Sequence, residues 1–160
     1  MAQTLLISAS DVVAECFTMT KTDTSLVKNT HIEAAQINSI KPILGDTLYA
    51  TIIAHKAANT LTANETILVN DYIKLPLKWY SYANCLINIF NQTGSGGIVN
   101  HRDEFGNQVS ASGFNLTQAE ANRIGDTYRE VLKKYLDDNF TLFPDYKKAT
   151  FVKSFGIIVD

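Results

Sequence analysis

Apolar residues recur at helical spacing along most of the chain, a pattern typical of a mainly α-helical protein. A short first helix is expected near residue 9, because Ser8 and Asp11 have the types and spacing of a helix start and Val12 and Val13 follow at once. A second helical pattern covers residues 25–41. Its apolar positions are Leu26, Val27, Ala34, Ile37 and Ile40.

The stretch IKPILGDTLY, residues 40–49, interrupts the second pattern. Pro42 has no N–H and disfavours a helical conformation at Lys41, so the helix is expected to end there. Gly45 can adopt a left-handed conformation, and Asp46 can cap the following helix. We therefore expect Pro42, Gly45 and Asp46 to form a rigid structural corner between two helices.

The third helical pattern begins at a capping box, Thr62 to Glu65, and continues to about residue 92. Apolar residues lie on more than one of its faces, which predicts a central helix with neighbours on several sides. Pro76 is expected to kink or break it. One apolar stripe comprises Leu68, Tyr72, Leu75, Trp79, Tyr82, Leu86 and Phe90, and a second comprises Val69, Ile73, Tyr80 and Ile87.

Residues 94–116 are rich in glycine and break the helical pattern. They predict a flexible loop or a β-hairpin with its turn near residues 103–106. We expect this excursion to act as an interaction loop. Its candidate contact residues are Gly94, Gly97, Val99, Phe105 and Val109.

A second capping box, Thr117 to Glu120, predicts the start of the last long helix. The residues expected on its core face are Ile124, Tyr128, Val131, Leu132, Tyr135 and Leu136. No repeat, linker or low-complexity tract divides the chain, so residues 1–160 are expected to form a single helical domain.

Residues 149–160 form an apolar, β-prone C-terminal tail. Such a segment is unusual at a free end of a chain, because exposed apolar and β-prone segments tend to pair with other chains. We predict that the tail docks on a partner through Phe151, Phe155, Ile157 and Val159.

Charge disfavours a broad nucleic-acid interface. The chain has 14 Lys and Arg against 16 Asp and Glu, and charged residues make up 19% of the sequence, below the usual ~25%. A surface poor in charge is easier to bury against partners. We therefore expect a protein that belongs to an assembly.

Few residues are candidates for catalysis or metal binding. Cys16 and Cys85 lack CxxC spacing and are expected to be reduced thiols. His101, Asp103 and Glu104 would form a metal or acid–base group only if other ligands converged on them, and a solvated loop tip is the favoured interpretation. His31 and His55 lack the HExxH spacing of a zinc site. The sequence predicts no enzyme, no cofactor, no metal and no membrane span.

Several motifs, taken in order, resemble a known family. They are LISASDV, EAAQINSIKPILGDTLY, DYIKLPLKWYSYANCL, the glycine-rich excursion followed by a long helix, and FPDY. In this combination the chain resembles the head-to-tail connector, or neck adaptor ring, proteins of tailed bacteriophages, and in particular the ring proteins of the crAss-like phages of Bacteroidetes. The resemblance covers about residues 4–146.

The resemblance implies a structural protein of the virion neck, made in the host cytoplasm. Copies of the chain would form a ring, typically about twelve-fold, between the portal protein and the next neck or tail protein. DNA would pass through the channel without sequence-specific binding. The alternative is a DNA-packaging accessory or another DNA-contacting module, for which residues 129–134 (REVLKK) and 146–148 (YKK) are the basic clusters.

Overall fold

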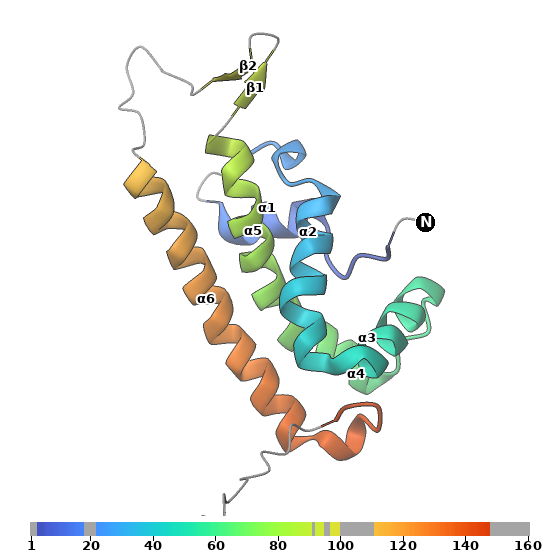
Figure 1. Cartoon of the computed structure of the whole chain (residues 1–160). Helices are drawn as coiled ribbons and strands as arrows, with labels where there is room; N and C mark the ends of the chain where they lie inside the picture. Colours follow the sequence, from blue (N-terminus) through green and yellow to red (C-terminus); the bar gives the residue numbers. More distant parts are fainter. Residues whose placement is uncertain (1–2, 18–21, 91, 95–96, 100–110, 148–160) are drawn as a thin grey trace, which may run out of the picture.

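Helix α5, Lys74–Phe90, runs through the centre of the structure (Figure 1). The computed structural model describes residues 3–17, 22–90, 92–94, 97–99 and 111–147. Over these residues the chain is a mainly α single domain, as expected from the sequence pattern, and its helices group into four segments. Helix α5 packs against helices of the other three segments, which confirms its predicted central place.

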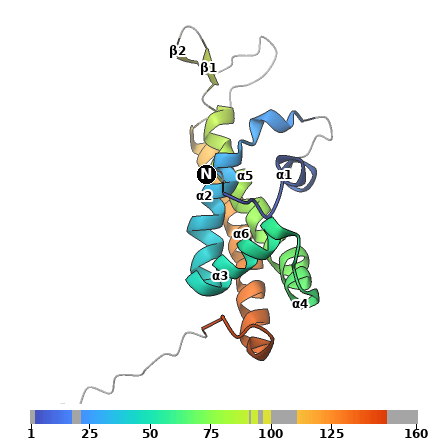
Figure 2. The same ribbon diagram turned by 90° about the vertical axis from the view of Figure 1, so that its right-hand side faces the viewer.

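The first segment is α1, Ala9–Cys16. Its start confirms the prediction, because the Asp11 N–H donates to Ser8 Oγ at 3.2 Å and the Ser8 N–H donates to Asp11 Oδ2 at 2.8 Å. A short 3-10 turn, η1 (Thr24–Leu26), precedes the second segment. Figure 2 shows α1 and α2 on opposite sides of α5.

The second segment comprises α2 (Asn29–Ala35), the π turn η2 (Gln36–Ile40) and α3 (Lys41–Ala58). The predicted end of the helix at Pro42 is wrong, since Lys41 keeps helical dihedrals of φ −53° and ψ −42°. A π turn shifts the hydrogen-bond register by one residue, so the helix can accommodate a following proline that lacks an N–H. Pro42 stands at the start of α3, directly after that turn.

The third segment repeats this arrangement. It comprises α4 (Ala63–Ile67), the π turn η3 (Leu68–Ile73) and α5, in which Pro76 is the third residue. The prediction was a kink or a break at Pro76; the chain stays helical through this residue, so the break is wrong for the same reason. The predicted capping box is confirmed, with the Thr62 N–H donating to Glu65 Oε2 at 2.8 Å and the Glu65 N–H donating to Thr62 Oγ1 at 3.3 Å.

Two short strands follow α5. Strand β1 (Gln92–Gly94) pairs antiparallel with β2 (Gly97–Val99), with Gln92 opposite Val99. The chain therefore reverses direction between Gly94 and Gly97. The turn predicted near residues 103–106 lies outside the described residues.

The fourth segment is α6 (Ala111–Asp138), followed by the 3-10 turn η4 (Phe140–Leu142). Helix α6 begins six residues before the predicted start, so residues 111–116 belong to a helix and not to the excursion. Thr117 and Glu120 are not a cap: Thr117 Oγ1 donates to the Gly113 carbonyl at 2.9 Å, and Glu120 accepts from Arg123 at 2.7 Å. At 1.5 Å per residue, α6 is about 42 Å long.

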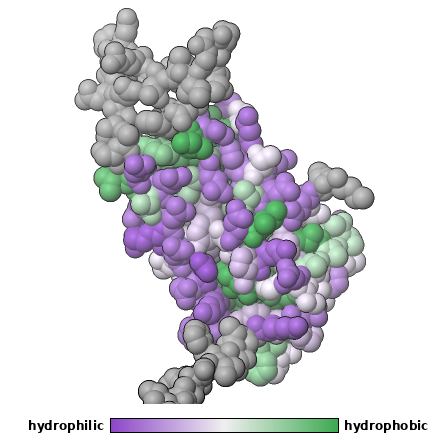
Figure 3. Space-filling model, in the orientation of Figure 1, coloured by the Kyte–Doolittle hydropathy of each residue, from purple (hydrophilic) through white to green (hydrophobic). Residues whose placement is uncertain are grey.

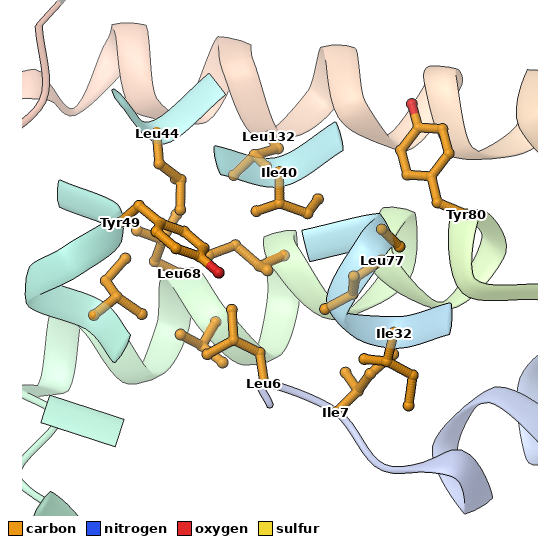
Figure 4. Close-up of a cluster of buried hydrophobic side chains, with 14 of the residues drawn as sticks. Leu6, Ile7, Ile32, Ile40, Leu44, Tyr49, Leu68, Leu77, Tyr80 and Leu132 are labelled. Carbon is orange, nitrogen blue, oxygen red and sulfur yellow. The ribbon is translucent and has the colours of Figure 1, made fainter. Parts of the chain in front are cut away.

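The core lies between α5 and the helices around it (Figure 4). It also contains a fully buried polar side chain, Gln36, in the π turn η2. The Leu6 N–H donates to Gln36 Oε1 at 2.7 Å, and Gln36 Nε2 donates to the Thr4 carbonyl and to Tyr49 Oη, both at 3.2 Å. Gln36 thus links the N-terminal residues Thr4 and Leu6 to Tyr49 of α3, and every buried polar atom of its amide has a partner.

Candidate interaction surface

The predicted corner lies at Gly45, inside α3. Gly45 has φ +78° and ψ 163°, a conformation that is essentially restricted to glycine, and the helix bends there. The expected positive φ is therefore confirmed. A Cβ atom on Gly45 would meet nothing within 4 Å, so the backbone conformation and not crowding requires a glycine.

Asp46 does not take the capping role predicted for it. Its exposed carboxylate lies 2.9 Å from Lys41 Nζ, on the other side of the bend. An exposed ion pair of this kind contributes at most about 1 kcal/mol. The bend is held chiefly by Gly45 itself and by the burial of Leu44 and Leu48 on its two sides.

An open groove of about 430 Å³ lies where α1, α5 and α6 meet. This volume is within the range of ligand-binding clefts, about 300–1,000 Å³. Most of the side chains along the groove are apolar. They are Cys16, Trp79, Tyr82, Leu116, Thr117, Glu120, Ala121 and Ile124.

One wall of the groove is a cluster of aromatic rings. Tyr82 packs edge-to-face against Phe17, the residue that follows α1, with ring centroids 4.9 Å apart, and against Trp79, with centroids 6.1 Å apart. Edge-to-face pairs of this kind are favourable and restrict ring motion. The stripe of α5 that contains Trp79 and Tyr82 therefore forms a preorganised apolar wall, while the stripe that contains Tyr80 faces α6.

The opposite wall belongs to α6, and here the predicted core face is partly wrong. Leu132 and Leu136 are fully buried, but Val131 is 49% exposed and Tyr128 is 36% exposed. The described part of α6 packs mainly on α5 and η3, so a narrow stripe through Ala121 and Leu132 fills the contact. Among the described residues, the next stripe of the helix is packed less closely: Ile124 is half-buried at the groove, and Tyr128 and Val131 are exposed.

We call this stripe the α6 flank, and it continues the groove along the helix. It comprises Leu116 (72% exposed), the half-buried Ile124, Tyr128 and Val131. Figure 3 shows that hydrophilic residues cover most of the face in view, with apolar residues gathered near the start of α6 and over α3 and α4. Contiguous exposed apolar residues commonly mark protein-interaction sites.

The groove contains no activated nucleophile. Burial raises the pKa of the Cys16 thiol to about 12, and burial raises that of the nearby Cys85 thiol to about 11. Both are free cysteines, as predicted. The charged Glu120 at the rim is paired with Arg123, whose hydrogen bond lowers the pKa of its carboxyl. The chemistry of the groove favours binding of apolar groups.

The two described histidines hold helices in place. His55 Nδ1 lies 2.9 Å from Glu65 Oε1, so it links α3 to the capping box of α4. The Lys28 N–H donates to His31 Nδ1 at 3.2 Å, and the side-chain amide of Asn88 lies 2.7 Å from His31 Nε2. Burial, with a smaller contribution from Lys28, lowers the pKa of His31.

The third candidate group, His101, Asp103 and Glu104, lies outside the described residues. Among the residues that the structure describes, no three His, Cys, Asp or Glu side chains are grouped so that they could hold a metal ion. In the same part of the chain, no helix is long and apolar enough to cross a membrane.

The predicted interaction loop is described only in part. The backbones of Gly94, Gly97 and Val99 belong to the β1–β2 pair, while Phe105 and Val109 lie outside the described residues. The docking residues of the tail also lie outside them. These are Phe151, Phe155, Ile157 and Val159.

The chain is well anchored before the tail begins. Phe143 is 2% exposed, the Tyr146 hydroxyl donates to Asp137 Oδ1 at 2.8 Å, and Thr51 Oγ1 donates to Asp145 Oδ2 at 2.8 Å. The FPDY motif therefore binds the end of α6 and the second half of α3. The last described residues therefore lie beside the C-terminal end of α6.

The basic clusters of the DNA-contacting alternative are partly engaged with acids. Lys134 Nζ lies 2.6 Å from Asp138 Oδ2, and Arg129 lies 3.8 Å from Asp126. A Lys or Arg side chain that is paired with a carboxylate attracts a DNA phosphate less strongly. These contacts give the DNA-contacting alternative no support.

A family-wide sequence pattern matches residues 40–156, which is most of the chain. It is described as a family of unknown function, DUF6712. The chain belongs to this family. The match begins at Ile40, two residues before Pro42, and it includes the bend at Gly45, α5, α6 and the first part of the tail. No curated protein and no solved structure matches the chain.

Sequence reasoning missed the groove. The signal was present in the two apolar stripes of α5, one through Trp79 and Tyr82 and the other through Tyr80 and Ile87, which together are too wide for a helix covered by a single neighbour. Periodicity alone does not say which of several apolar stripes stays open, because that depends on where α1 and α6 lie around α5.

Proposed function

We propose that this protein is a head-to-tail connector of a tailed bacteriophage, whose copies form a ring between the portal and the tail. The observation that carries the proposal is the α6 flank together with the groove beside it. A monomer that stays alone in solution has no need for a row of exposed Leu, Tyr and Val side chains on a long helix. A ring of identical subunits covers such a surface by contact with the next copy.

The bend at Gly45 supports the same proposal. In a closed ring, an error in the angle between two elements of a subunit recurs at every contact. A glycine-only backbone conformation, flanked by the buried Leu44 and Leu48, gives the subunit one defined angle. The order of motifs that resembles the neck adaptor proteins, from LISASDV to FPDY, adds to this argument.

The proposed partners follow from the role. They are further copies in a ring of about twelve, the portal protein on one face and the next neck or tail protein on the other. The interaction loop and the C-terminal tail are the proposed contact segments, and the proposed location is the virion neck. Packaged DNA would cross the ring without sequence-specific contacts.

The test is a phage that encodes this chain, with its gene deleted and supplied again from a plasmid. We expect the deletion to give DNA-filled heads without tails, and the wild-type plasmid to restore tailed, infectious particles. Electron microscopy of the restored particles should show the protein as a ring below the portal. Tailed particles formed without the gene, or particles that lack the protein, would overturn the proposal.

A second measurement separates the ring from the DNA-contacting alternative. Binding of the purified protein to duplex DNA is measured between 50 and 200 mM salt. A DNA-contacting module loses affinity steeply over this range because it releases counterions, roughly tenfold for every few phosphate contacts. A connector is expected to show only weak binding at either salt concentration.

A further inference from the structure

His31 lies in the first turn of α2, where its side chain takes the place that Glu or Gln usually has in a capping box. In that motif the third residue of the helix accepts a hydrogen bond from the backbone N–H of the capping residue. Here the Lys28 N–H donates to His31 Nδ1 at 3.2 Å. The start of α2 therefore depends on a side chain that can take up a proton near neutral pH.

This hydrogen bond fixes the protonation state of the ring. A backbone N–H can only donate, so His31 Nδ1 has a free lone pair and no proton, and the proton of the neutral ring lies on Nε2. The side-chain amide nitrogen of Asn88 lies 2.7 Å from Nε2, and two donors do not bind each other. A half-turn of the Asn88 amide interchanges its nitrogen and its oxygen. Asn88 Oδ1 is then the acceptor of the Nε2–H.

A second amide of α5 binds the backbone of the same histidine. Asn84 Nδ2 donates to the His31 carbonyl at 3.1 Å. Asn84 and Asn88 are four residues apart, so they lie on one face of α5. We call His31, Lys28, Asn84 and Asn88 the α2–α5 latch. It joins the start of α2 to the last two turns of α5.

We propose that the α2–α5 latch is an acid-sensitive switch, closed while His31 is neutral and open when its ring is protonated. Protonation from solvent places an N–H on Nδ1, directly opposite the Lys28 N–H. Two donors then face each other, so the imidazolium ring leaves the cap. The Lys28 N–H loses its acceptor, and Nε2 is withdrawn from Asn88. This switch does not depend on the connector role.

The surroundings of the ring favour its neutral form. Among the described residues, α5 presents the uncharged amides of Asn84 and Asn88 to His31, and Lys28 is the charged side chain that acts on the ring. Burial, with a smaller contribution from Lys28, lowers the pKa of His31 from 6.5. The unfolded chain therefore takes up this proton first as the pH falls. The stabilisation by the latch is complete above the unfolded-state pKa and is lost as the pH falls through the folded-state pKa.

The latch lies next to the predicted interaction loop. Asn88 is four residues before Gln92, the first residue of β1, and Figure 1 shows β1 and β2 directly beyond this end of α5. Opening the latch removes its hydrogen bonds between α2 and this end of α5. Acid therefore loosens the part of α5 that leads into the excursion.

Nuclear magnetic resonance of the full-length, isotope-labelled protein tests each step. Long-range proton–nitrogen spectra distinguish the two neutral forms of the ring, and at pH 8 we expect the proton of His31 on Nε2. On titration to pH 5, the Lys28 amide signal should move with the midpoint of His31. That midpoint should lie below the one measured for His31 in the urea-unfolded chain.

Hydrogen exchange at the Lys28 amide measures the opening itself. After correction for the intrinsic effect of pH on exchange, the protection of this amide should fall about fivefold from pH 8 to pH 5, the factor expected for the loss of a helix cap. Exchange at the same rate in the open and closed forms would mean that the ring does not hold the Lys28 N–H.

Two variants change the proton but keep the contacts. His31→Gln provides an acceptor that suits this position of a capping box and cannot be protonated, so the protection of the Lys28 amide should stay constant between pH 8 and pH 5. Asn88→Asp, at an exposed residue, offers the Nε2–H a carboxylate and should raise the midpoint of His31 above that of the wild type. The matched control is His55→Gln, at the other described histidine, which should leave the response of the Lys28 amide unchanged.

The proposal is wrong if the neutral ring of His31 carries its proton on Nδ1, because the Lys28 N–H would then have no acceptor in the ring. It is also wrong if the Lys28 amide of His31→Gln responds to pH like that of the wild type. If His31→Gln does not fold, Asn88→Asp still decides, since an unchanged midpoint would show that this side chain does not bind Nε2. None of these measurements uses phage particles, so failure of the connector role leaves them unaffected.

Discussion

Gly125 of α6 lies directly under the aromatic ring of Tyr80 of α5, so closely that a Cβ atom on Gly125 would lie 2.9 Å from Tyr80 Cε1. The Tyr80 hydroxyl donates to Asp126 Oδ1 at 2.6 Å, which fixes the ring over the helix. Burial, followed by the contact with Asp126, raises the pKa of Tyr80 and keeps it protonated as the donor. The α5–α6 contact is thus built on a glycine and a tyrosine.

Gly125→Ala is expected to lower the free energy of unfolding by roughly 1 kcal/mol. Overpacking against a rigid ring costs about 1–3 kcal/mol, and the higher helix propensity of alanine returns up to about 1 kcal/mol. In a Tyr80→Ala background the ring is absent, so Gly125→Ala should raise the free energy of unfolding. Urea unfolding of the four proteins measures both effects, and equal effects in the two backgrounds would show that the ring does not press on Gly125.

Gly45→Ala is expected to destabilise the protein by about 1–3 kcal/mol, because alanine rarely adopts φ +78° with ψ 163°. The new methyl group meets no neighbour, so strain in the backbone is the only source of the loss. The control is Asp46→Ala, which removes the exposed ion pair with Lys41 and should cost less than about 1 kcal/mol. Thermal unfolding measures both losses. A larger loss of stability for Asp46→Ala than for Gly45→Ala would mean that the ion pair holds the bend.

Glu65→Gln is expected to destabilise the protein by about 1 kcal/mol at pH 7 and by much less at pH 3. Burial raises the pKa of the Glu65 carboxyl, but hydrogen bonds from the Thr62 N–H and from His55 outweigh it, so the pKa is lowered from 4.5. The stabilisation is therefore complete above the unfolded-state pKa and is lost as the pH falls through the folded-state pKa. Urea unfolding of the wild type and the Glu65→Gln variant at several pH values measures this. A difference in the free energy of unfolding that stays constant from pH 7 to pH 3 would contradict this assignment.

Cys16 and Cys85 are expected to resist alkylation in the folded protein. With pKa values of about 12 and about 11, both thiols are almost fully protonated at pH 8, and the thiolate is the reactive form. Labelling by iodoacetamide, followed by mass spectrometry, should be at least about a hundredfold slower than for an unfolded control. In denaturant both should react; rapid labelling of either thiol in the native protein would place it in an open environment.

The start of the first helix, the capping box at Thr62 and Glu65 and the positive φ of Gly45 were all determined by the sequence. Each depends on interactions within a few residues, or on the backbone freedom of one residue, so local rules are sufficient. Only the tertiary structure decided that the helices continue through Pro42 and Pro76, each after a π turn. In the π turn before Pro42, Gln36 is fully buried and Ile37 is 41% exposed.

The start of α6 and the open groove were also decided by the tertiary structure. Residues 111–116 contain Gly113 and precede the predicted cap at Thr117, yet they are helical, so the tertiary context overrides weak local propensity. Likewise, Trp79 and Tyr80 are adjacent in the sequence and equally apolar. Tyr80 is buried because it faces Gly125 of α6, and Trp79 lines the groove because it faces the space between α1 and α6. The arrangement of the helices around α5 determines that difference, and no local pattern contains it.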